Sequence, residues 1–503
     1  MLGDNKSQPS TTMATTRSRT RKSSISQTST PITSNSTVNS SAASLNSSST
    51  SLSSMAEKPT TGKPMLDTYG NEFKIPDFTI KQIHDAIPKH CFKSSTLRSM
   101  SYVLRDGLLI AGNFIGFKCY IIPALAEQHV ATRVAAWGTY AFLQGLFGTG
   151  IWVLAHECGH GAFSPSKVVN DTVGWILHSS LLVPFWSWKI SHGKHHKATG
   201  HLERDMVFVP KSREEYSRRY AGGIGHDIAE LTEETPIATL IHLVLQQVFG
   251  WPMYLINNVT GHNFHERQSE GRGVGKKNGP GGGVNHFDPR SPLYEAKDAK
   301  WIIMSDIGIA TTMFCLYKAV QAFGAWNIFL WYGLPYIWVN HWLVAITFLQ
   351  HTDPSLPHYH PETWTYTRGA AATIDREFGF IGRHLLHGII ETHVAHHFVS
   401  SIPFYKADEA TEAIKKVMGN HYRSDTKGGA WGFVRALWRS ARWCQFVEPS
   451  ADVEGEAKGV VFFRNRNGFG VPPVPREKIA VRPSDVKGKE GVQVQVAEVS
   501  DSE

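Results

Sequence analysis

The stretch Ile151-Trp-Val-Leu-Ala-His156-Glu157-Cys158-Gly159-His160 closes a long apolar run with two histidines four residues apart. Residues i and i+4 lie on one face of a helix, so both imidazoles are expected to project from the same side. Because the apolar run directly precedes them, we expect the two histidines at a boundary between membrane and water.

Two further histidine clusters follow this stretch. They read His192-Gly-Lys-His195-His196 and His393-Val-Ala-His396-His397, and both place histidines at i, i+3 and i+4 on a helical face. Such clusters are rare by chance, and together with the first pair they supply enough neutral nitrogen ligands for two transition-metal ions. The predicted metal ligands are His156, His160, His192, His195, His196, His393, His396 and His397.

The kind of metal centre has two interpretations. The segment His156-Glu157-Cys158-Gly159-His160 also fits the H-E-x-x-H pattern of zinc proteases, in which Glu157 would act as general base. A zinc site needs three protein ligands, which would leave most of the other histidines unused. Imidazole suits iron, copper and zinc alike, but a set large enough for two ions beside apolar spans favours a di-iron, oxygen-activating centre.

Composition limits the partners. The 503 residues carry a net charge of +8, which suggests an anionic partner. Aromatic residues do not alternate with basic ones as in a nucleic-acid groove, so acidic lipid headgroups are expected and nucleic acid is not. The five cysteines form no CxxC pair, which argues against a disulfide framework and for a reducing compartment. These cysteines are Cys91, Cys119, Cys158, Cys315 and Cys444.

Apolar runs predict an all-α integral membrane protein with four transmembrane helices plus interfacial helices. An even number of spans returns the chain to its starting side, so all three histidine clusters would share one face. Two shorter or more polar runs, Val173–Trp188 and Ile237–Val259, are interpreted as interfacial. The predicted spans are Leu108–Leu125, Val134–Ala155, Ile302–Phe323 and Ile328–Leu349.

Three segments are expected along the chain. Residues 1–65 are rich in Ser and Thr and predict a disordered tail, and residues 66–448 form the catalytic membrane domain. The domain would end in a cytosolic helical cap with amphipathic helices at Ala407–Met418 and Phe433–Cys444. From residue 449 to 503 charge and glycine rise, which predicts a largely flexible tail.

Three longer motifs carry a resemblance to a known family. They are HHKATGHLERDMVFVP (His195–Pro210), LQHTDPSLPHY (Leu349–Tyr359) and DREFGFIGRHLLHGIIETHVAHH (Asp375–His397). With the histidine clusters, they resemble the membrane fatty acid desaturases, and more narrowly the fungal Δ12 (oleoyl) acyl-lipid enzymes and their ω3/Δ15 relatives. The resemblance extends from about Lys74 to Tyr422.

This resemblance implies a cytosolic di-iron site, with O2 as cosubstrate and a membrane lipid acyl chain as substrate. Removing hydrogen from an unactivated methylene is beyond a protein acid or base, so a metal centre is required. The sequence has neither a His-Pro-Gly-Gly haem motif nor a nucleotide-binding glycine motif, so electrons would come from cytochrome b5 and its NADH-dependent reductase. The implied location is the endoplasmic reticulum membrane, multi-pass, with both termini and the histidines on the cytosolic side.

Related desaturases use one more histidine to complete the metal ligands. His351 is the tentative candidate for this ninth ligand, and His341 is its rival. Overall likeness favours Δ12 desaturation of oleoyl lipid. Gly161 stands where the fungal Δ12 pattern often has Gln, which leaves ω3/Δ15 or bifunctional Δ12/ω3 activity open. Hydroxylase and conjugase variants share the same motifs, and the acyl carrier is left open as well.

Overall fold

The computed structural model describes residues 63–218, 235–261 and 284–475. All of them belong to one compact unit, Thr61–Glu503. The disordered tail predicted for residues 1–65 lies, apart from residues 63–65, outside the described residues, as does the end of the predicted C-terminal tail after residue 475.

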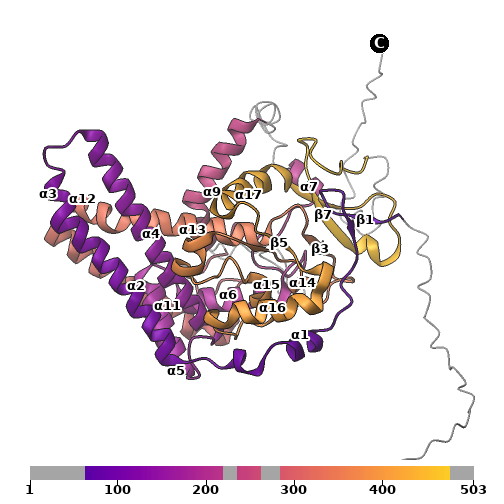
Figure 1. Ribbon diagram of the computed structural model, residues 1–503, viewed down its shortest axis with the longest axis horizontal. Helices are drawn as coiled ribbons and strands as arrows, with labels where there is room; N and C mark the ends of the chain where they lie inside the picture. Colours follow the sequence, from indigo (N-terminus) through magenta and orange to yellow (C-terminus); the bar gives the residue numbers. More distant parts are fainter. Residues whose placement is uncertain (1–62, 219–234, 262–283, 476–503) are drawn as a thin grey trace, which may run out of the picture. The chain divides into compact units, whose positions relative to one another are not determined.

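Most of the described chain is helical, in agreement with the predicted helical class (Figure 1). Nine helices of the described part have twelve or more residues: α2 (Thr96–Gly116), α4 (Val130–His160), α5 (Lys167–Ser180), α6 (Phe185–Ala198), α9 (Pro236–Asn257), α11 (Ala299–Phe323), α13 (Leu334–His351), α16 (Ala407–Met418) and α17 (Gly429–Trp443). The short helices are α1 (Ile80–Ala86), α3 (Ile122–Ala124), α7 (Arg213–Arg218), α12 (Ala325–Ile328), α14 (Tyr366–Ala370) and α15 (His393–Phe398).

The sequence predicts where several helices begin and end. Ser95 and Ser166 precede α2 and α5, and each side-chain oxygen accepts a hydrogen bond from a backbone N–H of the first turn. At the other end of α4, Gly161 adopts a φ of 73°, where a side chain would be strained. The N–H of Ala162 then donates to the carbonyl of Glu157, so the chain turns sharply right after His160.

Three helical segments among the described residues are long and apolar enough to cross a membrane: Thr96–Ala124, Pro236–Asn257 and Ala296–Phe323. Two of them contain the predicted spans, Leu108–Leu125 apart from its last residue and Ile302–Phe323 in full. The third, α9, covers most of Ile237–Val259, which the sequence predicts to be interfacial; it is a continuous apolar helix despite Pro252, long and apolar enough to span as well. Its exposed apolar side chains, such as Ile241 and Leu245, suit contact with lipid.

The other two predicted spans also form helices, but neither is among the three membrane-span candidates. The second half of α4 is buried inside the protein, and α13 packs against both α4 and α9. Their apolar residues therefore form much of the protein's own core, in which Trp152, Leu343 and Leu349 are buried. The expectation of four spans remains a prediction.

The expectation of an all-α fold is wrong in detail, because the described residues also form small sheets. The largest has the order β3–β7–β6 and is antiparallel, with Tyr359 opposite Val460 and Phe446 opposite Arg464. Two-residue strands form the other two sheets, β1 with β2 and β4 with β5. The strands are β1 (Met65–Leu66), β2 (Glu72–Phe73), β3 (Pro357–Tyr359), β4 (Asp375–Arg376), β5 (Ser424–Asp425), β6 (Phe446–Pro449) and β7 (Val460–Arg464).

The prediction of a flexible tail from Pro449 onward is therefore wrong for residues 449–475. All five residues of β7, Val-Val-Phe-Phe-Arg, are buried, and β7 is the central strand of its sheet. A short apolar strand between two partner strands buries both of its faces. It is held in place by partner strands, one of which is distant in sequence. The predicted cap helix Ala407–Met418 is α16 with the same bounds, and Phe433–Cys444 lies largely within α17.

Candidate metal centre

Four helices bring nine histidines together. The last turn of α4 carries His156 and His160, and α13 ends at His351. The second and third clusters lie on α6 and α15, as their spacing predicted. Since α6 packs against α4, and α4 against α13, the ends of these helices meet in one buried region (Figure 1).

The nine imidazoles form two adjoining groups. In the first, which we call the five-histidine group, the candidate ligand atoms all lie within 4.8 Å of one another. The distance from His192 Nε2 is 3.2 Å to His156 Nε2 and 3.1 Å to His196 Nε2. This group consists of His156, His160, His192, His196 and His396.

The second, which we call the four-histidine group, is built around His351. Its Nε2 lies 3.3 Å from His195 Nε2 and 3.0 Å from His393 Nε2, and His397 lies within the same cluster. Two imidazoles bound to one ion at the usual metal–nitrogen distance have their nitrogens about 3.0 to 3.4 Å apart. The observed separations in both groups have this value.

The spacing within each cluster explains how two groups arise from it. On α6, the i and i+4 residues His192 and His196 belong to the five-histidine group, whereas His195 belongs to the other. On α15 the assignment is reversed, because His396 joins the five-histidine group and His397 the four-histidine group. Adjacent helical residues point about 100° apart, so each H-x-x-H-H cluster divides its imidazoles between two neighbouring centres.

Several of these ring nitrogens have no hydrogen-bond partner in the described part of the chain. The buried Nε2 atoms of His160, His396 and His397 have no hydrogen-bond partner among the described residues. An unpaired buried polar atom costs free energy, and a metal ion would remove that cost. Burial, and then the neighbouring imidazoles, hold the pKa values of His196, His393 and His397 well below the usual range. The rings are therefore neutral, as a metal ligand must be.

Residues outside the clusters orient the four-histidine group. Asp205 Oδ1 lies 2.6 Å from His195 Nδ1, and its other oxygen accepts from the N–H of Gly200 at 2.8 Å. Thr199 donates to the carbonyl of His195, so its hydroxyl oxygen is free to accept from His397 Nδ1 at 3.1 Å. Sequence reasoning assigned no role to Asp205 or Thr199, although both lie in the motif His195–Pro210. A carboxylate shortly after a histidine cluster is the signal that could have found Asp205.

Of the two candidates for a ninth ligand, the structure brings only His351 to the other histidines. The ring of His341 packs on Trp342, at 4.8 Å between centroids, and His341 belongs to neither group. Two other buried histidines have partners outside both groups: His387 Nε2 lies 2.7 Å from Asp106 Oδ2, and His201 Nδ1 accepts from the N–H of Glu203.

Glu157 is directed away from the ring nitrogens that face one another. Its Oε2 accepts from the N–H of Phe404 at 2.9 Å, and Oε1 lies 3.7 Å from His156 Nδ1, on the outer side of that ring. Burial raises the pKa of Glu157 to about 8. A protease base must instead face the metal-bound water, so this orientation disfavours the zinc protease interpretation.

Comparison with known proteins decides the family. Residues 133–428 match the family model described as fatty acid desaturase, and residues 4–113 match a domain of unknown function. The chain belongs to the fatty acid desaturase family. The predicted resemblance is thereby confirmed, and both histidine groups lie within the segment that this desaturase model matches.

Three relatives illustrate the range of this desaturase family. An oleate hydroxylase of Claviceps purpurea is 58% identical over 82% of this chain and 86% of its own length. A Delta(12) fatty acid desaturase of Mortierella alpina is 43% identical over 80% and 95%. An omega-6 fatty acid desaturase of the endoplasmic reticulum from Brassica juncea is 41% identical over 78% and 93%.

Proposed function

We propose that this desaturase is a membrane oxidoreductase that introduces a cis double bond at the Δ12 position of an oleoyl chain carried by a lipid. The observation that carries the proposal is the pair of adjoining histidine groups, with buried, neutral nitrogens at the separations of ligands that share an ion. Membership of the family and several Δ12 relatives support the acyl substrate.

The proposed cofactor is a pair of iron ions, one in each histidine group. Bound iron would supply the O2-dependent oxidation of an unactivated methylene, which amino-acid side chains cannot perform. The five-histidine group would hold one ion through residues of α4, α6 and α15, and the four-histidine group the other through α6, α13 and α15. His351 is the proposed ninth ligand.

The protein's own residues exclude water and fix the ligands. His195, His393 and His397 are at most 4% exposed, and Trp188 stacks on His192 with ring centroids 4.6 Å apart. Asp205 and Thr199 accept hydrogen bonds from the Nδ1 atoms of His195 and His397, so the Nε2 atoms of these rings stay directed at the ion. Electrons would come from cytochrome b5 and its NADH-dependent reductase.

The proposed location is the endoplasmic reticulum membrane, with four spans and with the histidines on the cytosolic side. The exposed apolar surfaces of α2, α9 and α11 support membrane insertion. A relative named for the endoplasmic reticulum supports that compartment.

Hydroxylation of the oleoyl chain is the second candidate function. The observation that favours it is the 58% identity to an oleate hydroxylase, compared with 43% to the Delta(12) desaturase of Mortierella alpina. Desaturation and hydroxylation share the oxidation of the same kind of methylene, and the nine histidines fit both. An ω3 or bifunctional Δ12/ω3 activity is a further variant of the same reaction.

The test is the fatty acid profile of yeast that lacks Δ12 activity and expresses this chain, measured by gas chromatography–mass spectrometry. The proposal expects new linoleate, and none with His196→Ala at equal expression. Formation of α-linolenate in addition to linoleate would indicate a bifunctional enzyme. Product formed only when linoleate is fed would indicate an ω3 enzyme. Hydroxylated oleate would support the second candidate function. His341→Ala is the matched control, because that histidine lies outside both groups.

A further inference from the structure

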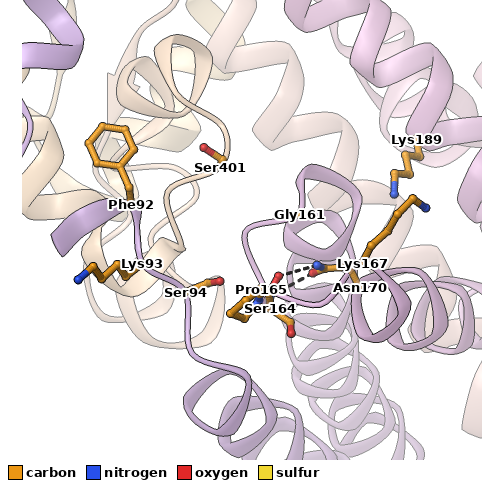
Figure 2. A pocket seen from close by; sticks show the side chains of 10 residues that line it. All are labelled: Phe92, Lys93, Ser94, Gly161, Ser164, Pro165, Lys167, Asn170, Lys189 and Ser401. Carbon is orange, nitrogen blue, oxygen red and sulfur yellow. Dashed lines mark hydrogen bonds between the residues drawn. The ribbon is translucent and has the colours of Figure 1, made fainter. Parts of the chain in front are cut away.

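An open cavity of ≈ 670 Å³, lined by lysines and hydroxyl groups as well as apolar side chains, lies beyond the end of the first histidine helix. Figure 2 shows its wall, which is formed by the segment before α2, the turn after α4, the first turn of α5, Lys189 of α6 and Ser401. Nothing in the proposed metal centre uses this cavity, because none of the nine histidines lines it.

The segments that line the cavity lead to the metal centre on one side and to a membrane-span candidate on the other. Gly161, in its wall, directly follows His160, and Ser401 lies four residues after His397. On the opposite side, Ser94 comes two residues before α2, which begins the first membrane-span candidate. The two sides are joined where the hydroxyls of Thr96 and Ser164 lie 2.6 Å apart. A lipid held here would have its polar end beside the start of a span and its acyl chain near the histidines.

The charge of the wall is positive. Lys93, Lys167 and Lys189 line the cavity, and none of the described residues that line it is acidic. Asp171, just outside, pairs with Lys189 at 2.7 Å and also with Lys167, so one carboxylate serves two ammonium groups. Lys93 forms no ion pair with another described residue, and Lys406 adds another cation by donating to the carbonyl of Lys93.

Neutral donors complete an environment for an anion. The hydroxyls of Ser94 and Ser401 belong to the wall. The fourteen-residue helix α5 begins at Lys167 in the same wall, so the positive end of its dipole faces this region. At Gly161 an added Cβ would meet no atom within 4 Å, so the wall is open at the position nearest the histidines.

We propose that this cavity binds the phosphate of the acyl substrate's headgroup, placing the substrate for oxidation at the adjoining histidine groups. This inference rests on the proposed function for its substrate. Several lysines, two hydroxyls and a helix N-terminus are the donors that a phosphate group requires. The phosphate could belong to a phospholipid or to an acyl coenzyme A, which share this chemistry.

The test compares three probes that carry the same oleoyl chain: oleoyl lysophosphatidylcholine, oleoyl coenzyme A and monooleoylglycerol, which has no phosphate. Their Kd values are measured by equilibrium binding to the purified, iron-loaded full chain in detergent. The variant is Lys93→Gln, which removes a charge that pairs with no described residue, and the matched control is Lys416→Gln, an exposed lysine of α16 outside the cavity. Bound iron per chain is measured for each protein.

For Lys93→Gln we expect a loss of affinity of about three- to tenfold for the phosphate-bearing probe that is the true carrier. Binding of monooleoylglycerol, the iron content and every Kd of Lys416→Gln should stay unchanged. The probe that loses affinity identifies the phospholipid or the coenzyme A ester as carrier. A second variant, Ser401→Ala, should weaken the same probe.

The proposal would be overturned if Lys93→Gln and Lys416→Gln bound each phosphate-bearing probe with the same Kd. It would also be overturned if Lys93→Gln lost as much affinity for monooleoylglycerol as for the phosphate-bearing probes. The proposed function fails separately, if the wild-type chain makes no oxidised oleoyl product. A phosphate-selective effect of Lys93→Gln would stand in that case.

Discussion

The two histidine groups are held in different ways, although they share two helices. In the five-histidine group, His156 and His160 come from the end of the 31-residue helix α4, and the rings of Trp152 and Trp188 pack against His156. In the four-histidine group, His351 ends α13, and Asp205 and Thr199 hold the outer nitrogens of its neighbours. Helix packing fixes the first group, whereas hydrogen bonds from a loop and from a short strand fix the second.

The short strand β4 contacts two of the elements that carry histidines. Arg376 of β4 donates to the carbonyl of Leu349 at 2.8 Å and to Asp353 Oδ2 at 2.8 Å, which brackets His351 from both sides in sequence. Its neighbour Asp375 accepts from the N–H of Val394 at 2.7 Å, at the start of α15. One dipeptide thus joins two elements that carry histidines of the four-histidine group. Among the described residues, no such pair of adjacent residues hydrogen-bonds on both sides of a histidine in the five-histidine group.

The largest effect should follow from removing one imidazole from either group. We expect His160→Ala and His393→Ala each to lower activity by more than about a hundredfold, exceeding the 10–100-fold typical of outer partners. Product analysis in yeast and iron analysis of purified protein measure this. His341→Ala is the control, and a comparable loss there would contradict the assignment of the groups.

The next largest effect concerns Arg376, whose hydrogen bonds hold the residues on either side of His351. Arg376 is 1% exposed, and Arg376→Gln would leave Asp353 buried without its main cation. Removing one partner of a buried ion pair costs about 3–5 kcal/mol. We expect a lower midpoint of thermal unfolding in detergent, with loss of metal from the four-histidine group.

Arg383→Gln is the matched control for that prediction. Arg383 pairs with Glu377, but its side chain is 45% exposed, so its loss should cost only about 0–1 kcal/mol. Equal destabilisation by the two variants would show that Arg376 does not hold His351 in the way its contacts indicate.

A smaller and more selective effect is expected from Asp205→Asn. The change keeps the size of the side chain but weakens the acceptor for His195 Nδ1, so metal affinity of the four-histidine group should fall by about 10–100-fold. Titration with a chelator, followed by metal analysis, should show one ion leaving earlier than the other. Asp85→Asn, at an exposed position of helix α1, is the control. Loss of both ions together would contradict the separate support of the two groups.

The smallest effect is expected at Glu157. Glu157→Gln retains an acceptor for the N–H of Phe404 and should change activity by less than about threefold. The zinc protease interpretation requires the opposite, because Glu157 would then be the general base. Activity of Glu157→Gln in the yeast assay therefore separates the two interpretations directly.

Local patterns in the sequence predicted much of this site. Spacings of three and four residues placed the imidazoles on helical faces, and all eight predicted ligands, with His351, lie in one of the two groups. The helix α16 was also predicted with its observed bounds, because its apolar residues recur with the helical period.

Contacts between distant segments could not be predicted in this way. Asp205, Thr199 and Arg376 act through partners that only the fold brings near, and no spacing reveals them. The residues of strand β7 were predicted to belong to a flexible tail. A run of five apolar and basic residues within a charged region is too short to indicate a buried strand. In α9, single polar residues favour an interfacial position, whereas its overall length and hydropathy would also suit a span, so the sequence alone does not decide between them.

The most direct measurement is metal analysis of the purified full chain by inductively coupled plasma mass spectrometry, combined with Mössbauer spectroscopy. The two groups predict close to two iron ions per chain, and close to one in His393→Ala, with the remaining ion in the five-histidine group. A single zinc ion per chain in the wild type, retained in His393→Ala, would contradict the account.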